Sequence, residues 1–228
     1  MKTLISSLII FLLTSCTIAQ KIETESRETG RFNQIKVEKG VNLELVQNTD
    51  DNLLKITARN FDLQDVITEV RGETLYLSKK GSTFSNSGVD ITVPFGNLSK
   101  IEASGGSDIE NSGILELEEL IIEASGGSDL DLNLNVFYLE CNLSGGSDAE
   151  LKGSSKAAYY QASGGSDIDA NNFKVEKATL RLSGGSDVDL YASEEVNIEA
   201  SGGSDVNVSG GASIINDNSD RSSDVSIH

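Results

Sequence analysis

A five-residue motif, Ser-Gly-Gly-Ser-Asp, occurs six times in the chain and constrains its fold more than any other feature. The copies begin at Ser104, Ser125, Ser144, Ser163, Ser183 and Ser201. The intervals of 21, 19, 19, 20 and 18 residues are typical of repeat proteins. One unit of this size cannot bury an apolar face alone, so the repeat predicts coils that stack on one another.

Apolar residues recur at fixed positions around each copy, with polar residues between them. One such set stands three residues before the motif: Ile101, Ile122, Cys141, Tyr160, Leu180 and Ile198. This alternation is typical of β-strands. Paired glycines suit a sharp corner between two strands, because glycine adopts positive φ at the least cost. Each unit is therefore predicted to form a strand, a glycine turn and a second strand. The whole chain is predicted to be an all-β solenoid. The predicted turn glycines are Gly105, Gly106, Gly126, Gly127, Gly145, Gly146, Gly164, Gly165, Gly184, Gly185, Gly202 and Gly203.

The first part of the chain lacks a legible repeat, but short alternating segments predict strands there. The expected strands are residues 31–37, 41–46, 53–58, 66–70, 74–77 and 89–93. We therefore expect an irregular N-terminal β region over residues 31–97 and the β-helix repeats over residues 98–208. The motif decays in residues 209–212, Ser-Gly-Gly-Ala, and we expect residues 209–228 to form a cap over the open edge of the last coil.

The N-terminus resembles an export signal and is set apart from the fold. Lys2 precedes an apolar run, residues 4–13, that is too short to span a bilayer. Leu13-Thr14-Ser15-Cys16 resembles a bacterial lipobox, in which Cys16 is the lipidated first residue of the mature protein. The alternative is ordinary signal-peptidase cleavage after Ala19, which leaves Gln20 as the first residue.

Export follows from either kind of cleavage. Residues 1–19 are expected to be the signal segment and residues 20–30 a short tether. We expect the chain in the periplasm or at the outer membrane as a lipoprotein, or else secreted, with membrane contact only through a lipid anchor at Cys16. Cys141, the other cysteine, lies in an apolar column and is expected to be a buried hydrophobe.

The chain is strongly acidic, with 36 acidic against 18 basic residues and a formal net charge of −18. Such a surface repels phosphate backbones and anionic membranes, which argues against nucleic acid as a partner. It favours cations, basic ligands or simple solubility, and most of these charges are expected to form a solvated face.

Stacking the motifs places their aspartates in one column. The column comprises Asp108, Asp129, Asp148, Asp167, Asp187 and Asp205. Like charges about 4.8 Å apart repel by about 0.9 kcal/mol per pair even in bulk water, so an offsetting interaction is expected. A row of Ca²⁺ ions is one hypothesis, because Ca²⁺ takes carboxylate and carbonyl oxygens. The alternative is that each aspartate accepts hydrogen bonds from turn N–H groups and serine hydroxyls.

Three segments, together with the repeat, resemble a known family. Phe32-Asn33-Gln34-Ile35-Lys36-Val37 is followed by Val41-Asn42-Leu43-Glu44-Leu45, by Val89-Asp90-Ile91-Thr92-Val93-Pro94 and then by the repeated Ala-Ser-Gly-Gly-Ser-Asp. This order is similar to that of the putative auto-transporter adhesin, head GIN domain family of secreted bacterial proteins, common in Bacteroidetes. The resemblance implies a right-handed parallel β-helix with a more irregular N-terminal part.

Enzyme signatures are scarce in the sequence. The only histidine is His228, so a Ser-His-Asp relay or a histidine metal site has no central residue. Paired carboxylates could hydrolyse a polysaccharide, but a catalytic site should interrupt the repeat locally, whereas the carboxylates recur evenly. Arg181 does interrupt its column, where a lone arginine among acids is expected to balance charge. Tyr159, Tyr160 and Tyr191 could offer sugar-stacking surfaces, although Tyr160 lies in an inward column and is expected in the core.

Three functions remain open on these observations. We expect a non-enzymatic cell-envelope protein with an acidic binding or adhesive face, whose partner is a glycan or an envelope protein. The alternatives are a carbohydrate-active, polysaccharide-degrading β-helix enzyme and a purely structural spacer. A locally irregular acidic cleft would favour the enzyme, and uniform aspartate columns would favour binding or spacing.

Overall fold

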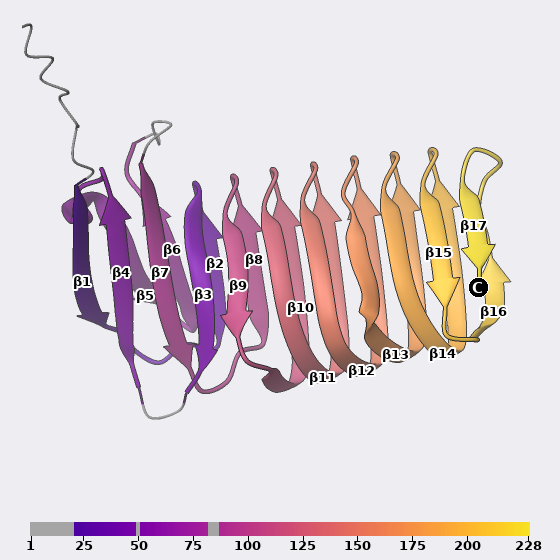
Figure 1. The fold of residues 1–228 in the computed structure, drawn as a ribbon, viewed down its shortest axis with the longest axis horizontal. Helices are drawn as coiled ribbons and strands as arrows, with labels where there is room; N and C mark the ends of the chain where they lie inside the picture. Colours follow the sequence, from indigo (N-terminus) through magenta and orange to yellow (C-terminus); the bar gives the residue numbers. More distant parts are fainter. Residues whose placement is uncertain (1–20, 49–50, 82–86) are drawn as a thin grey trace, which may run out of the picture.

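The computed structural model describes residues 21–48, 51–81 and 87–228. These residues form β-strands and one short 3₁₀-helix, η1 (Leu63–Asp65), and no helix among them is long and apolar enough to cross a membrane. The strands join into one continuous sheet wound into a solenoid (Figure 1). The strands are β1 (Ile22–Glu28), β2 (Gln34–Glu38), β3 (Val41–Gln47), β4 (Leu53–Arg59), β5 (Val66–Arg71), β6 (Thr74–Lys79), β7 (Gly88–Phe95), β8 (Lys100–Ser104), β9 (Asp108–Ser112), β10 (Leu115–Ser125), β11 (Asp129–Ser144), β12 (Asp148–Ser163), β13 (Ile168–Ser183), β14 (Asp187–Ser201), β15 (Asp205–Ser209), β16 (Ser213–Asp217) and β17 (Asp224–Ile227).

The coils stack in parallel. Each of β11 to β14 descends one side of the stack after a glycine turn, bends at the bottom and returns along the other side to the next turn (Figure 1). We call the descending segments the front sheet and the returning segments the back sheet. β12 follows β11 in parallel register from Asp129 opposite Asp148 to Ser144 opposite Ser163. The predicted parallel β-helix is therefore confirmed.

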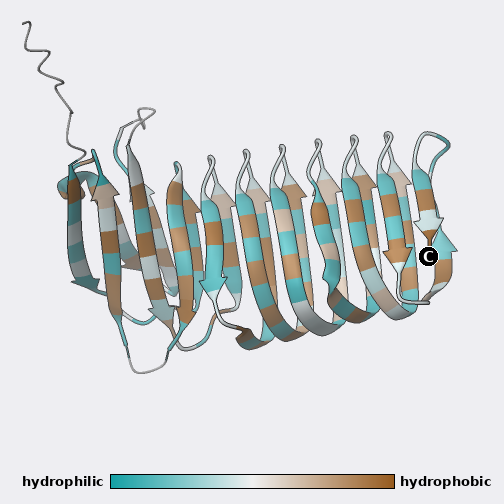
Figure 2. Ribbon diagram, in the orientation of Figure 1, coloured by the Kyte–Doolittle hydropathy of each residue, from teal (hydrophilic) through white to brown (hydrophobic). Residues whose placement is uncertain are grey.

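A narrow apolar core lies between the two sheets. Apolar and polar residues alternate along each strand, as the banding in Figure 2 shows. The column that begins at Ile101 is almost completely buried in all six coils, and Tyr160 and Cys141 are fully buried in it, as predicted. Burial raises the pKa of the Cys141 thiol to about 12, so the thiol stays protonated and acts as a small apolar side chain.

The glycine corners have the backbone conformation that the motif predicts. Both glycines of every copy have φ between 66° and 79°, a region that other residues enter at a cost. The first glycine also lies against the coil before it. A Cβ atom on Gly202 would approach the backbone nitrogen of Gly184 to 2.8 Å. Glycine is therefore required at this position both for the turn and for the spacing between coils.

The second serine of each motif forms a buried ladder beneath the corners. Its side chain is fully buried, and its Oγ accepts the backbone N–H of the equivalent serine in the preceding coil. The N–H of Ser107 donates to Ser128 Oγ at 3.3 Å, and the N–H of Ser128 donates to Ser147 Oγ at 3.2 Å. The Ser128 hydroxyl in turn donates to the carbonyl of Ser125 at 3.1 Å. The ladder satisfies backbone donors that the sharp turn would otherwise leave buried and unpaired.

The N-terminal region contains a coil that is hidden in the sequence. β2 and β3 pair in parallel with β8 and β9, and Lys39 and Gly40 take the place of the two glycines with φ of 62° and 63°. In space this coil lies between the β6–β7 and β8–β9 coils, although it precedes both in the chain. Strands lie at all the expected N-terminal positions, but part of this region continues the regular stack.

The predicted tether at residues 20–30 is wrong as a description of the fold. Residues 22–28 form β1, which pairs antiparallel with β4 and covers the N-terminal end of the front sheet. Arg27 fixes β1 to the neighbouring layer, because its guanidinium donates to the carbonyls of Val66 and Leu63, both at 2.7 Å. The segment has only one apolar residue, so its backbone and Arg27, and not a hydrophobic pattern, determine its place.

The C-terminal tail continues the stack. β16 pairs in parallel with β14, and β17 with β15, so the tail covers the preceding edge by adding strands. The expected decay of the motif through residues 209–212 is wrong, because this segment lies at the bottom bend, where Ala212 N–H bonds to Ala192 O. A further corner beyond the six motif copies is formed by residues 220–224, Asp-Arg-Ser-Ser-Asp, where Ser223 Oγ accepts the N–H of Ser204 at 3.3 Å.

Candidate functional site

Two columns of polar, mostly acidic side chains run along the front sheet. The upper column lies directly below the corners and contains the six predicted aspartates, which the strand register brings side by side. The lower column lies two residues further along each strand. In spatial order its members are Thr92, Glu44, Glu110, Asp131, Glu150, Asp169, Asp189, Asn207 and Ser226.

The upper column is longer than the motif predicts. Asp90 and Asn42 extend it at the N-terminal end, because β3 pairs in register with β9 on one side and with β7 on the other. Asp224 extends it at the C-terminal end, opposite Asp205. The motif does not identify these three residues, because none of them stands in a Ser-Gly-Gly-Ser-Asp copy.

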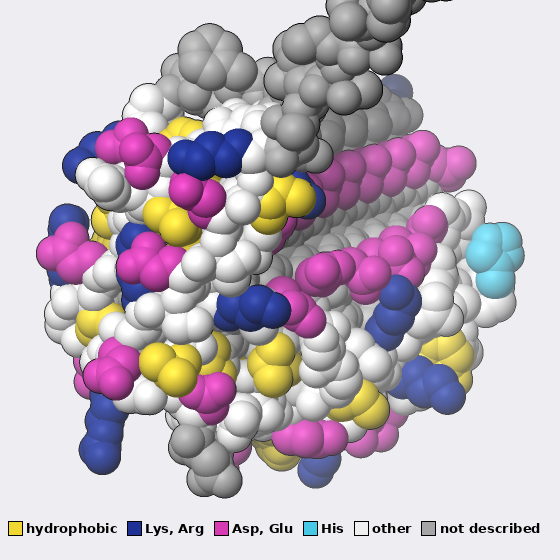
Figure 3. Space-filling model, turned by 60° about the vertical axis from the view of Figure 1, so that its left-hand side comes forward, with side chains coloured by type: hydrophobic (Ala, Val, Ile, Leu, Met, Phe, Trp, Pro, Cys, Tyr) yellow, Lys and Arg dark blue, Asp and Glu magenta, His cyan; other side chains and the backbone are white. Residues whose placement is uncertain are grey.

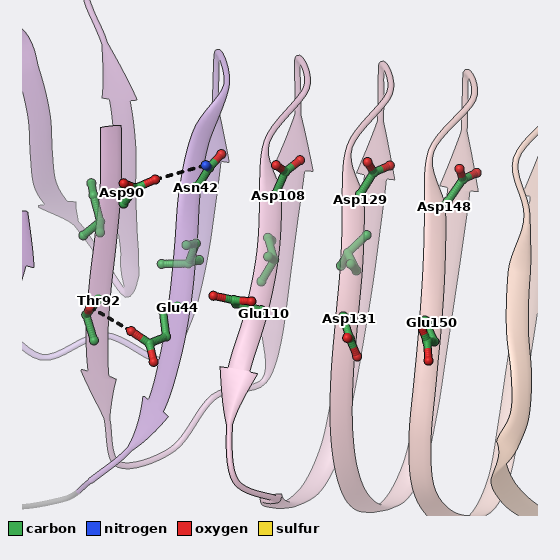
Figure 4. Close-up of a pocket in the computed structure, with 14 residues that line it drawn as sticks. Asn42, Glu44, Asp90, Thr92, Asp108, Glu110, Asp129, Asp131, Asp148 and Glu150 are labelled. Carbon is green, nitrogen blue, oxygen red and sulfur yellow. Dashed lines mark hydrogen bonds between the residues drawn. The ribbon is translucent and has the colours of Figure 1, made fainter. Parts of the chain in front are cut away.

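A groove of about 490 Å³ lies between the columns in the N-terminal half of the front sheet. Figure 3 shows the two rows of Asp and Glu side chains running side by side with a hollow between them. Figure 4 shows how β7, β3, β9, β11 and β12 contribute one residue each to both rows. The floor is the backbone of the residues between the rows, whose apolar side chains point into the core. We call this feature the acidic groove, lined by Asn42, Glu44, Asp90, Thr92, Asp108, Glu110, Asp129, Asp131, Asp148 and Glu150.

At the N-terminal end of the groove, hydrogen bonds and one ion pair offset the negative charge of Asp90 and Glu44. Asp90 accepts from Asn42 Nδ2 at 3.0 Å, and the Arg59 guanidinium lies 2.9 Å from its other oxygen. In the lower row Glu44 accepts from the Thr92 hydroxyl at 3.0 Å. An amide and a hydroxyl thus stand where the regular pattern has carboxylates, so this end carries less uncompensated charge than the middle.

The middle of the upper row has no compensating cation among the described residues. Asp108, Asp129 and Asp148 stand on neighbouring coils, and none of them has an ion pair with a Lys or Arg of residues 21–48, 51–81 and 87–228. Partial burial, and then the charges of Asp129 and Asp90, raise the pKa of Asp108. The charged form of Asp108 is therefore disfavoured by the fold.

The lower row has a cation of its own. Lys152 Nζ lies 2.9 Å from Asp131 and 2.8 Å from Glu150, and both carboxylates are largely exposed. Exposed ion pairs of this kind contribute about 0–1 kcal/mol. Lys152 therefore offsets charge in the lower row and leaves the upper row unchanged.

Backbone N–H groups donate hydrogen bonds to three aspartates of the upper column. Asp148 accepts the N–H of Asp167, Asp167 that of Asp187 and Asp187 that of Asp205, each at 3.3 Å. This is the turn chemistry of one of the two hypotheses. No group of three or more His, Cys, Asp or Glu side chains gathers around one point in the part of the chain that the structure describes. The calcium row stays a prediction.

The remaining site predictions lie at the two ends of the chain. Cys16, the predicted lipidation site, lies outside the described residues. His228, the only histidine of the chain, is exposed at the last position.

Comparison with known proteins assigns the chain to a family. The sequence model of the family described as putative auto-transporter adhesin, head GIN domain, matches residues 31–212. The chain belongs to this family. The adhesin description indicates a non-enzymatic adhesive role and an exported or cell-surface protein, and it agrees with the resemblance of the N-terminal segments and the repeat.

Several solved structures share the fold. A putative adhesin from Bacteroides fragilis is 22% identical, with a TM-score of 0.80 over 91% of this chain and 97% of that chain. A putative adhesin from Parabacteroides merdae is 18% identical, with a TM-score of 0.72 over 91% and 96% of the two chains. A putative lipid binding protein from Parabacteroides distasonis is 17% identical, with a TM-score of 0.69 over 90% and 94%. No curated protein matches the chain. At these identities the likeness establishes the fold alone.

Proposed function

We propose that this chain is a non-enzymatic adhesion module of the cell envelope, and that it binds a positively charged partner through the acidic groove. The observation that carries the proposal is the uncompensated middle of the upper row. Asp108, Asp129 and Asp148 repel one another by about 0.9 kcal/mol per neighbouring pair in water, at a strand spacing of about 4.8 Å. A row of cationic groups laid along the groove would relieve this repulsion at every coil.

The rigidity of the stack supports a partner with repeated charges. Hydrogen bonds between coils fix the spacing of the carboxylates, so the groove needs little reorganisation when it binds. Complementary charge of this kind accelerates association and weakens as salt rises. A basic segment of an envelope protein, or a glycan that carries amino groups, has the required chemistry.

The predicted processing supports a place in the envelope. A signal segment at residues 1–19 and a lipid anchor on Cys16 would hold the solenoid in the periplasm or at the outer membrane. Cleavage after Ala19 would instead release a secreted form. Adhesion requires export, and both routes provide it.

The regularity of the columns favours binding over catalysis. Carboxylates recur from Asp90 to Asp224 along the stack, and no single coil concentrates them. A structural spacer would have the same columns, but it would not bind a cationic partner. A measurement of binding to a cationic partner therefore distinguishes an adhesion module from a structural spacer.

Adhesion can be measured with beads that carry the chain from Gln20 onward. We expect these beads to adhere to a surface coated with polylysine or chitosan at low ionic strength and to detach as NaCl rises. Beads carrying a variant with Asp108, Asp129 and Asp148 changed to Asn should adhere less. Equal adherence of the two kinds of bead would contradict the proposal.

A further inference from the structure

The back sheet carries one local interruption of the repeat. The outward position two residues before each motif holds Glu102, Glu123, Asn142, Gln161, Arg181 and Glu199. Among the six motif coils, amides and a guanidinium thus replace the acid in three adjacent ones. Two tyrosines, Tyr138 and Tyr159, lie on the same face in two of these coils. Ladders of like residues would suffice for a stack, so this group of planar side chains points to a ligand.

The strand register places the two tyrosines and the arginine on a diagonal. Tyr159 lies one coil further and two residues higher than Tyr138, because Tyr138 is opposite Ala157. Arg181 lies one further coil along and again two residues higher, because it is opposite Gln161. The diagonal crosses β11, β12 and β13.

Contacts within the group hold its side chains in place. The Tyr159 hydroxyl donates to Gln161 Oε1 at 2.9 Å, and the Arg181 guanidinium lies 5.9 Å from the centre of the Tyr159 ring. Arg181 Nε lies 3.0 Å from a Glu199 oxygen. Both tyrosine side chains are half-buried although they face outward. Tyr159 and Arg181 are therefore held in place before any ligand binds, which reduces the entropy lost on binding.

These side chains line a shallow trough that runs along the solenoid. A depression of about 500 Å³ contains both tyrosines and Arg181. It shares Asn142 and Gln161 with a second depression of about 390 Å³, and Gln161 and Arg181 with a third of about 350 Å³. The trough therefore crosses several strands and suits an extended chain molecule.

We propose that this trough binds an uncharged linear oligosaccharide. Tyrosine rings offer flat apolar surfaces to the C–H faces of sugar rings, and the amides, carboxylates and guanidinium offer paired donors and acceptors to hydroxyl groups. The Arg181 charge is balanced by Glu199, and Glu123 and Glu140 add negative charge, so an anionic sugar is disfavoured. The site lies on the sheet opposite the acidic groove and does not depend on it.

Tyrosine fluorescence gives a direct binding measurement, because the chain has five tyrosines and no tryptophan. The chain from Gln20 onward is titrated with hexasaccharides of β-1,4-glucan, β-1,3-glucan and α-mannan, and with hexagalacturonate. We expect saturable binding of at least one neutral hexasaccharide and weaker binding of the uronate. Tyr159→Ala should lower the affinity by about tenfold or more through loss of the stacking ring, and Tyr159→Phe should keep it within about threefold.

Phe137→Ala is the matched control. Phe137 precedes Tyr138 on β11 and is more exposed, at 60%, but it lies outside the trough. We expect this variant to bind as the wild type does, and circular dichroism verifies that each variant is folded. Absence of binding to all three neutral probes, stronger binding of the uronate, or an equal loss in Phe137→Ala and Tyr159→Ala would overturn the proposal.

Discussion

The serine ladder gives the sharpest prediction about stability. Ser128→Ala removes the acceptor of the buried Ser107 N–H and the donor to the Ser125 carbonyl. Ser128 is fully buried, so water cannot replace either partner without opening the corner. An unsatisfied buried donor costs about 1–3 kcal/mol, and we expect the free energy of unfolding to fall by about 2 kcal/mol. Urea denaturation followed by circular dichroism measures this change.

Ser125→Ala is the control within the same motif. Ser125 is half-buried at the start of the corner, and its hydroxyl has no hydrogen bond among the described residues. We expect this variant to stay within about 0.5 kcal/mol of the wild type. Hydrogen exchange adds a local measurement, because the Ser107 amide should lose protection in Ser128→Ala alone. Equal stability of the two variants, with the Ser107 amide still protected, would refute the ladder as a source of stability.

Three further predictions concern charged and reactive groups. The fold raises the pKa of Asp108, so the contribution of this group to stability is fully present below its ordinary pKa and is lost as pH rises through its pKa in the folded state. Asp108→Asn should therefore raise the melting temperature at pH 7 and leave it unchanged near about pH 3. Ca²⁺ should raise the melting temperature no more than ionic-strength-matched NaCl if turn chemistry accounts for the column, because Asp148, Asp167 and Asp187 already accept backbone N–H groups; a specific rise that Asp148→Asn together with Asp167→Asn abolishes would instead establish the predicted calcium row. Cys141 should resist a thiol reagent at pH 8 in the native chain from Gln20 onward and react once urea unfolds it; rapid native labelling would contradict its burial.

The repeat predicts most of the fold because one motif contains all the requirements of a corner. Its glycines provide positive φ, and its second serine provides the buried acceptor. The two hidden corners each meet part of these requirements with other residues. Lys39 adopts positive φ beside Gly40, and Ser222 and Ser223 replace a glycine and the ladder serine near the C-terminus. The side-chain motif does not identify these corners, because each keeps a different part of it: Lys39 and Gly40 keep the positive φ, whereas Ser223 keeps the serine acceptor without positive φ at Arg221 or Ser222.

The candidate site could be predicted in part for a related reason. The aspartates of the motif align because consecutive coils stack in chain order. Asp90 and Asn42 join the column out of that order, since β3 lies between β7 and β9. The tether at residues 20–30 failed because backbone pairing and Arg27, which leave no hydrophobic pattern, place β1. Strand order at the N-terminal end is a tertiary property that local alternation does not encode.

The acidic groove as the binding face can be tested most directly with two variants of equal net charge. One changes Asp108, Asp129 and Asp148 to Asn within the groove. The other changes three exposed acids outside the groove, Glu118, Glu176 and Glu194, to Gln. Fluorescence anisotropy of a labelled hexalysine peptide at about 20 mM salt measures the affinity of each. We predict that the groove variant binds about tenfold or more weakly than the other variant, which should remain close to the wild type. Equal affinities would show that binding follows net charge alone and would contradict the groove as the binding face.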